Sequence, residues 1–424
     1  MLSRVLLIAL VLLVSISCAL SFQGSLANGK SLKIAPTSAG KVGPLMSAVE
    51  EPMDYFDKAD KYKEDSRKFR RNVFGHPEWR NHRSSKRYWK NLRTTFNSGV
   101  IQGLLLEVLS VVTIATFVCG YNAWVGGETP LGVPDAFPFG KLEAPALPFT
   151  LSSPALGLLL VFRTNSAYAR WWDARIQWGF TINRTRDFVR NGLCFFNSKN
   201  GYANTPEVIA QKTRFTHLVI AYARSVKGHF RDGQDEEDKL YSEFVGLLGQ
   251  EDADKIMEAK HRPMRIVQEL STVVNNANMN DVQLSTIDRN LSGFCDTVGV
   301  CERIFKTPMP LVYTRHTSRF LAIWLLFLPL TLYKELGDSY LHLATIPVSF
   351  LIAVFFLGIE ELGIQIEEPF SVLPMEVMCD GIEGSCKEML ANDIAMSAPL
   401  APATTTAFSG LPQAMQKAAE PVAK

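Results

Sequence analysis

Two segments of this 424-residue chain set clusters of charged side chains directly beside long apolar runs. Residues 163–179 follow the apolar run 147–162 and carry three arginines and an aspartate: Arg163, Arg170, Arg175 and Asp173. Residues 357–370 follow the apolar run 341–356 and carry four glutamates: Glu360, Glu361, Glu367 and Glu368. Charges at such a boundary need partners, so one interpretation is an ion-pair network between these arginines and glutamates. The other interpretation is that the arginines line an aqueous vestibule and raise the local concentration of anions.

A stripe of apolar residues lies inside the first apolar run. Pro154, Leu158 and Phe162 recur every four residues, so a helix presents them on one face. Taken alone, this spacing is typical of a stripe that packs in a core or faces lipid. The spacing therefore predicts a helix with one distinct apolar face but does not by itself assign that face a role.

Four apolar runs predict the elements that position these side chains. We expect membrane spans near residues 100–124, 147–164, 313–334 and 340–360. Several runs are shorter than the roughly 20 residues of a span, which indicates helices that leave the membrane and continue into water. Soluble helices are expected over 164–195, 206–230, 236–249, 251–277 and 281–306, and again within 360–390. The Ala/Pro/Thr-rich tail, 391–424, has the composition of a disordered segment.

The composition agrees with an all-α membrane protein that has a large soluble helical domain. The chain is 47% hydrophobic and 20% charged, with a net charge of +2. It contains no P-loop, HExxH or GxSxG motif and no GxGxxG after a predicted strand, so no enzyme activity is predicted. His217 and His229 are isolated along the chain, and no metal site is predicted.

The N-terminal region reads as a targeting sequence followed by a basic segment. Residues 1–49 contain no Asp or Glu, and they predict a signal peptide over 1–21 and a plastid transit peptide over 22–49. This layout resembles the bipartite plastid presequences of diatoms and related algae, with simple secretion as the alternative. Residues 50–96 form a basic juxtamembrane segment, with ten Lys or Arg against one acid between 67 and 93. Its aromatic residues would also suit nucleic acid, but the position before a span favours lipid headgroups and no nucleic-acid partner.

The two charged segments and the sequence TPMPLVYTRH at 307–316 closely resemble the bestrophin family of anion channels. The similarity covers about residues 70–390 and is closest to the calcium-independent branch of bacteria and plastids. The resemblance implies a homopentamer around one pore, with a channel domain over 97–390 and four transmembrane helices per subunit. It implies a pore neck at Pro154, Leu158 and Phe162 and a pore aperture at Met309.

The resemblance also gives these positions a physical role. Rings of apolar side chains gate a pore by excluding water, and the positive edge of a Phe162 ring favours anions. Pro154 departs in size and shape from the aliphatic residue usual in the family. In animal bestrophins the Pro-Phe corresponding to residues 369–370 is followed by acids that hold calcium. Here Ser371 to Met375 contain no acid, so no calcium site and no other cofactor are expected.

The implied function is passive, anion-selective conduction of chloride across a lipid bilayer, with bicarbonate or nitrate as further permeant ions. Together with the presequence, it predicts a chloride channel of the thylakoid membrane that balances charge during light-driven proton pumping. A bicarbonate channel that feeds a carbon-concentrating mechanism is the alternative. A second alternative is a non-conducting scaffold or assembly protein of the photosynthetic membrane, which the proline at 154 favours.

Overall fold

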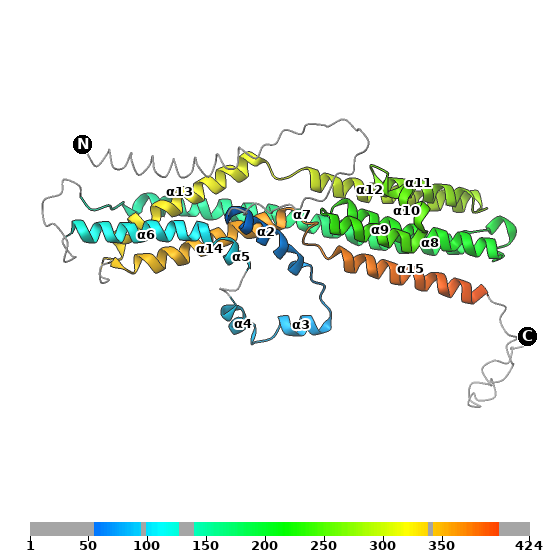
Figure 1. Cartoon of the computed structure of the whole chain (residues 1–424), viewed down its shortest axis with the longest axis horizontal. Coiled ribbons are helices and arrows are strands. Elements are labelled where there is room, and N and C mark those ends of the chain that lie inside the picture. Colours follow the sequence, from blue (N-terminus) through cyan, green and yellow to red (C-terminus); the bar gives the residue numbers. More distant parts are fainter. Residues whose placement is uncertain (1–54, 95–98, 127–139, 338–341, 398–424) are drawn as a thin grey trace, which may run out of the picture. The chain divides into compact units, whose positions relative to one another are not determined.

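The computed structural model describes residues 55–94, 99–126, 140–337 and 342–397, and every regular element among them is a helix (Figure 1). The predicted presequence, 1–49, and the chain beyond 397 lie outside these residues. The chain divides into two compact units. The first combines Met1–Trp172 with Pro308–Val372, and the second combines Asp173–Thr307 with Leu373–Lys424.

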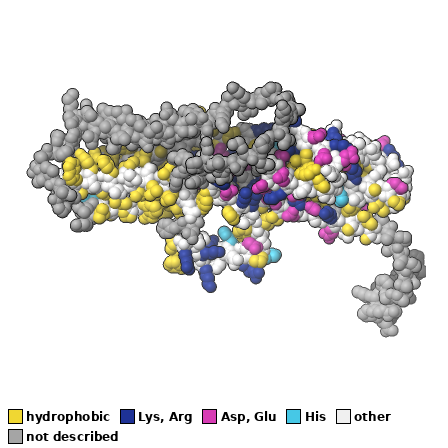
Figure 2. Space-filling view, in the orientation of Figure 1, with side chains coloured by type: hydrophobic (Ala, Val, Ile, Leu, Met, Phe, Trp, Pro, Cys, Tyr) yellow, Lys and Arg dark blue, Asp and Glu magenta, His cyan; other side chains and the backbone are white. Residues whose placement is uncertain are grey.

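The first unit holds the most apolar helices. Its N-terminal elements are α2 (Tyr55–Arg67), η1 (Lys68–Arg70), α3 (His76–His82), α4 (Arg87–Arg93) and α5 (Gly99–Gly103). Its longer helices are α6 (Leu105–Val125), the first part of α7 (Ala146–Phe195), α13 (Leu311–Glu335) and α14 (Thr345–Glu367). On the face shown in Figure 2, apolar side chains are concentrated over these longer helices.

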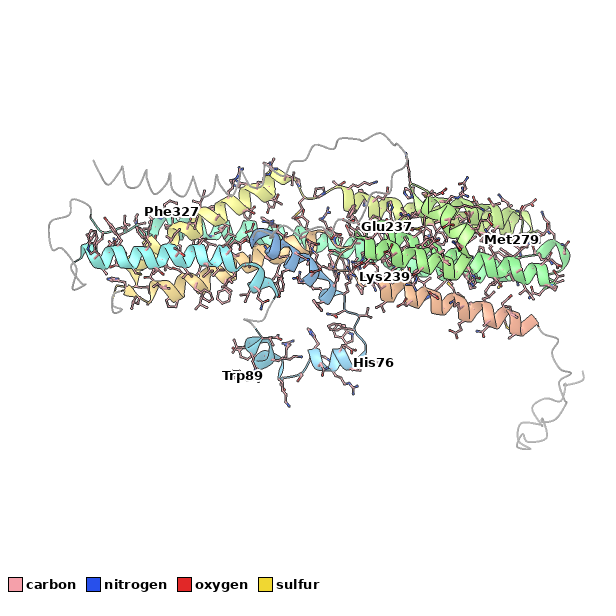
Figure 3. All side chains as sticks on the ribbon, viewed as in Figure 1. His76, Trp89, Glu237, Lys239, Met279 and Phe327 are labelled. Atoms are coloured by element: carbon pink, nitrogen blue, oxygen red, sulfur yellow. The ribbon has the colours of Figure 1, made fainter. Side chains whose placement is uncertain are left out.

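Four helices of the first unit share one apolar core. Each contributes buried residues spaced three or four apart, so one stripe of each helix turns inward. These residues are Val108 and Val111 of α6, Leu156 and Leu160 of α7, Leu321, Leu325 and Leu328 of α13, and Ala353 and Leu357 of α14. A smaller apolar cluster includes Val118, Cys119, Leu330 and Tyr333, against which Phe327 of α13 packs (Figure 3). The remaining sides of the helices are left exposed in the single chain.

Three helices of the described chain are long and apolar enough to cross a membrane: Leu105–Val125, Ala146–Asn200 and Thr345–Glu367. Four spans are predicted from the sequence, and α13 is the one that does not meet this criterion. Arg315, His316 and Arg319 lie in its first turns and Lys334 near its end, which shortens its uninterrupted apolar stretch. Nevertheless, α13 packs in the same core as the other three.

Helix α7 runs without a break for 50 residues. Residues 147–164 and 164–195, predicted as a span and a soluble helix, therefore form one continuous element. Pro154 lies inside it. A proline removes one backbone hydrogen-bond donor and often kinks a helix, yet α7 continues through this position.

The second unit is a bundle around α8 (Pro206–His229), with the rest of α7, η3 (Ser198–Asn200), α9 (Gln234–Leu248), α10 (Gln250–Met257), α11 (Arg262–Asn275), α12 (Asp281–Lys306) and α15 (Met375–Ser397). Its centre is aromatic: the rings of Phe188 and Phe215 lie 4.9 Å apart, and Tyr222 stacks on Phe294 at 4.4 Å. At Gly192 an added Cβ would lie 2.3 Å from the Phe215 ring, so α7 and α8 can approach this closely only with glycine there.

Two predicted boundaries in this unit are wrong. The single helix predicted over 251–277 is divided into α10 and α11, because Pro263 occupies the first turn of α11 and cannot donate a hydrogen bond inside a continuous helix. The boundary predicted at 391 is also wrong, since α15 continues to Ser397. Asp393, within this extra length, forms an ion pair with the buried Lys212 at 2.7 Å.

Ion pairs attach α15 to α8. The largest group surrounds Arg224, which lies 2.7 Å from both Asp380 and Glu383 and 3.3 Å from Glu243. Burial alone would raise the pKa of Glu383, but hydrogen bonds from Lys387 and Arg224 outweigh it and hold that pKa below its ordinary value. The carboxylate therefore stays ionised opposite the arginine at neutral pH.

Replacing Arg224 with alanine leaves three acids without their common cation. We expect the free energy of unfolding to fall by about 3 kcal/mol, as is typical when one partner of a largely buried pair is removed. Thermal unfolding of the purified protein measures the change. Lys387→Ala is the matched control, since Lys387 contacts the same Glu383 at 2.7 Å from an exposed position and should contribute less than about 1 kcal/mol. Equal losses from the two variants would contradict a role for Arg224 in holding α15.

Candidate functional site

The first half of α7 has two opposite faces. Leu156, Leu160 and Arg163 are buried in the first unit. Pro154, Leu158 and Phe162 lie on another side of the helix and are exposed, with 54% of Leu158 and 53% of Phe162 accessible. An exposed apolar stripe of this size on a membrane helix must face lipid, contact another copy of the chain or line a pore.

The charge at the end of the apolar stretch is buried and paired. Arg163 is only 4% exposed, and its Nη1 donates to Glu360 Oε1 at 2.7 Å and to Ser318 Oγ at 3.2 Å. Ser318 also hydrogen-bonds Glu360. The three residues come from α7, α13 and α14, so one charged cluster joins three apolar helices. For Arg163, this geometry agrees with an ion pair rather than with an arginine that lines an aqueous vestibule.

The carboxylates of the other three glutamates contact residues other than Arg163, Arg170 and Arg175. Glu361 is buried and lies 3.8 Å from Lys63, and it also accepts a hydrogen bond from Gln365 at 2.6 Å. Glu367 Oε1 accepts the backbone N–H of Met309 at 3.0 Å. Glu368 accepts from Arg67 at 3.0 Å and from the backbone N–H groups of residues 370 and 371. These glutamates at the polar end of α14 therefore hold neighbouring segments of the first unit in place.

The remaining predicted charges are distributed over both units. Arg170 Nε donates to the backbone carbonyl of Glu367 at 3.0 Å. Asp173 and Arg175 lie on the part of α7 that belongs to the second unit, where Asp173 is exposed and Arg175 is half-buried. Among the described residues, the structure therefore joins the two predicted sets by the Arg163–Glu360 ion pair and by the bond from Arg170 to the backbone of Glu367.

Cations of the basic segment 50–96, which the sequence predicts to face lipid headgroups, instead contact the acidic end of α14. Besides Lys63 and Arg67, Arg70 donates to Gln365, and Arg71 Nε donates to the carbonyl of Ser371 at 3.0 Å. Burial and the neighbouring Arg67 lower the pKa of Arg70, while Glu361 opposes this. The opposite charges of the cations over 63–71 and the acids over 360–368 are the feature of the sequence that indicates this pairing.

Met309 lies in a different environment from the stripe on α7. Only 7% of it is exposed in the single chain, and its N–H is held by Glu367. The following helix, α13, is tied to α7 where the Tyr313 hydroxyl donates to the carbonyl of Leu159 at 3.0 Å. The start of α13 is thus fixed beside the level of Leu158.

The segment after Pro369 is apolar and packed. Phe370 and Leu373 are fully buried, and Val372 is almost so. The carboxylates on either side of this segment are both paired, Glu368 with Arg67 and backbone donors and Glu376 with Arg231. The side chains described between 370 and 375 therefore supply no group of oxygen ligands of the kind that calcium needs.

Comparison with known proteins gives the family. The family profile described as Bacterial/Fungal Bestrophin protein matches residues 78–388. The chain belongs to the bestrophin family. The Arabidopsis thaliana protein named voltage-dependent chloride channel 1, chloroplastic, is 31% identical over 337 residues, which cover 80% of this bestrophin and 77% of that protein. Voltage-dependent chloride channel 2, chloroplastic, from the same plant is 33% identical over 321 residues, covering 76% and 73%.

Solved structures share the fold of this bestrophin. The crystal structure of a bacterial bestrophin homologue from Klebsiella pneumoniae superposes with a TM-score of 0.55 at 23% identity, covering 68% of this chain and 98% of that one. A crystal structure of the same homologue with a single substitution gives a TM-score of 0.56 at the same identity and coverage. The all-helical architecture is therefore that of the family.

Removing the cation of the buried pair should destabilise this bestrophin strongly. Arg163→Met leaves Glu360 without a counter-ion, and we expect a loss of about 3–5 kcal/mol in the free energy of unfolding. Melting of the detergent-purified protein measures it, and Arg163→Met with Glu360→Met should recover most of the loss. Arg190→Met is the control, because Arg190 forms an exposed pair with Asp187 at 2.7 Å. A loss no larger than that control would show that the pair does not hold the three helices.

Proposed function

We propose that this bestrophin is a passive, anion-selective chloride channel of the thylakoid membrane, formed by five copies of the chain around one pore. The observation that carries the proposal is the exposed apolar stripe of α7, which contains Phe162 and lies away from the buried Arg163. Membership of the family supports it, as do relatives that are named chloroplastic voltage-dependent chloride channels.

In the proposed assembly, the stripe of each copy faces the central axis. Pro154, Leu158 and Phe162 then form successive rings of a neck. Such rings exclude water when narrow, which closes the pore to hydrated ions. The positive edges of the Phe162 rings favour an anion over a cation at the last ring. The other exposed sides of α6, α7, α13 and α14 meet lipid or a neighbouring copy, and α13 serves as the fourth span.

The pairing of Arg163 limits which residues can select anions in the proposed channel. Because Arg163 is neutralised by Glu360, it acts as a positioning residue that fixes how α7 is rotated. Anion preference is therefore assigned to the neck and to residues that are more exposed than Arg163. The vestibule role predicted for arginines stays as a proposal for Arg175, which is half-buried in the second unit.

The location and the physiological ion rest on the N-terminal region and the named relatives. The predicted presequence, together with chloroplastic relatives, supports a plastid membrane, and an anion flux into the thylakoid lumen would offset the charge of pumped protons. Chloride is the ion in the names of the two plant relatives. Bicarbonate conduction and a non-conducting scaffold are the outcomes that a recording distinguishes from this proposal.

The test is single-channel recording of residues 50–424 in planar bilayers under a KCl gradient. The unsubstituted protein should reverse near the chloride equilibrium potential. Phe162→Ala should lower the ratio of chloride to potassium permeability by roughly tenfold, which corresponds to about 1.4 kcal/mol and lies within the range of aromatic electrostatic interactions.

Phe355→Ala is the matched control for Phe162→Ala. Phe355 is also an exposed phenylalanine on an apolar helix, with 64% accessible, but it belongs to α14. Its replacement should leave the reversal potential unchanged. Identical effects of the two substitutions would contradict the neck. Replacing chloride by bicarbonate without loss of current would move the role toward carbon supply, and silence from assembled pentamers would favour the scaffold.

The proposed aperture at Met309 makes a separate prediction. The residue is covered in the single chain, so an aperture requires its side chain to reach the axis in the open pentamer. Met309→Ala should then raise single-channel conductance while leaving the reversal potential close to that of the unsubstituted protein. Met264→Ala, a partly exposed methionine of the second unit, is the control. If conductance does not change, Met309 is a packing residue and the aperture lies elsewhere.

A further inference from the structure

Three side chains that can bind metal converge in the second unit, although they lie far apart in the sequence. His229 ends α8, His261 is the N-cap of α11, and Glu302 lies near the end of α12. His229 Nε2 lies 2.8 Å from Glu302 Oε1, and His261 Nε2 lies 3.2 Å from the same oxygen. His229 is isolated along the chain, so the sequence predicts no metal site there, but the fold brings it next to His261 and Glu302.

The distances are close to those of a metal centre. One ligand atom from each residue lies within 4.8 Å of the other two. A tetrahedral Zn²⁺ ion with bonds of 2.0–2.1 Å separates its ligands by about 3.3 Å. The two measured nitrogen-to-oxygen distances need to grow by only a few tenths of an ångström to admit the ion. The two imidazole rings stack at a centroid distance of 4.8 Å.

The chemistry of the donors selects the class of ion. Two imidazoles and one carboxylate are typical ligands for zinc, whereas calcium and magnesium prefer oxygen alone. Both oxygens of Glu302 face nitrogen groups: Oε1 lies next to His229 and His261, and Oε2 lies 3.3 Å from Lys306. All three side chains remain partly exposed, with 22–36% accessible, so an ion can reach them from water.

Besides the two His–Glu302 contacts that the ion would replace, two further contacts compete with it, and both are long. Lys306 Nζ lies 3.3 Å from Glu302 Oε2, the oxygen that the histidines do not contact, and Lys306 is largely exposed. His261 Nδ1 accepts the backbone N–H of Met264 at 3.3 Å, so the proton of the neutral ring is on Nε2. Binding a metal through Nε2 moves that proton to Nδ1 and gives up one long capping hydrogen bond.

We propose that His229, His261 and Glu302 form a binding site for a single Zn²⁺-class divalent ion that links the ends of α8, α11 and α12. Each residue supplies one ligand, and a water molecule completes the tetrahedron. The site does not depend on the pore, because all of its ligands belong to the second unit.

The experiment is calorimetric titration of ZnCl₂ into full-length, chelator-treated protein, with Co²⁺ as a spectroscopic probe. We expect one Zn²⁺ per chain, an intense visible absorption from tetrahedral Co²⁺ and a higher melting temperature with metal. His229→Ala and His261→Asn should each weaken binding at least about tenfold, since even changes outside the ligand shell have effects of this size. Asparagine is chosen at 261 because it retains an N-cap acceptor.

The control is His217→Ala, on the same helix as His229. His217 contacts the carbonyl of Leu247 and lies outside the cluster. It should leave the affinity for zinc unchanged. Metal-free melting temperatures equal to that of the unsubstituted chain show that each variant is folded. The proposal is overturned if no stoichiometric zinc binds, or if His229→Ala and His261→Asn bind it as tightly as His217→Ala. Because binding is measured without current, its failure is separate from failure of the proposed channel.

Discussion

The arrangement of the first unit depends on one buried ion pair. Arg163 follows Phe162 directly in the chain, and adjacent residues of a helix point about 100° apart. A guanidinium in an apolar bundle must be paired, and Glu360 with Ser318 supplies that pairing from two other helices. Once Arg163 is held on the inner side of α7, the rotation of the helix is set. Phe162, Leu158 and Pro154 are then left on an outer side, where they remain exposed.

The same requirement explains the polar end of α14. Its glutamates contact Lys63, Arg67 and the backbone of Met309, so these acids hold segments of the first unit together. In the proposed channel, the narrowest point therefore needs no net positive wall. There, apolar rings and aromatic edges, which carry no formal charge, are proposed to decide which ions pass.

Much of this architecture could be predicted from the sequence because it rests on local patterns. The four-residue spacing of Pro154, Leu158 and Phe162 predicts a shared face, and the sign and number of the charges indicate ion pairs between the arginines and the glutamates, although not that Arg163 forms one. The long-range pairings could not be predicted in the same way. Nothing local to Arg67 indicates Glu368 as its partner, and His229 meets His261 and Glu302 only through the packing of three helices.

Two residues show how local signals and packing can diverge. Pro263 marks the helix break between α10 and α11, and a proline in that position is a recognised start signal. Met309 illustrates the opposite case, since resemblance assigns it to a pore while the single chain buries it against the acidic end of α14. Whether the Met309 side chain is exposed in an assembly depends on how copies of the chain pack together, and local patterns in one sequence do not describe that packing.

The most direct measurement of the central claim is cysteine accessibility in conducting, reconstituted channels. Phe162→Cys and Phe355→Cys would be treated in planar bilayers with a negatively charged, water-soluble thiol reagent, using the unsubstituted chain to account for its own cysteines. The account predicts that modification at 162 changes the current and that modification at 355, on an exposed part of α14, does not. Current that is insensitive at 162, or equally sensitive at both positions, would contradict a pore lined by this face of α7.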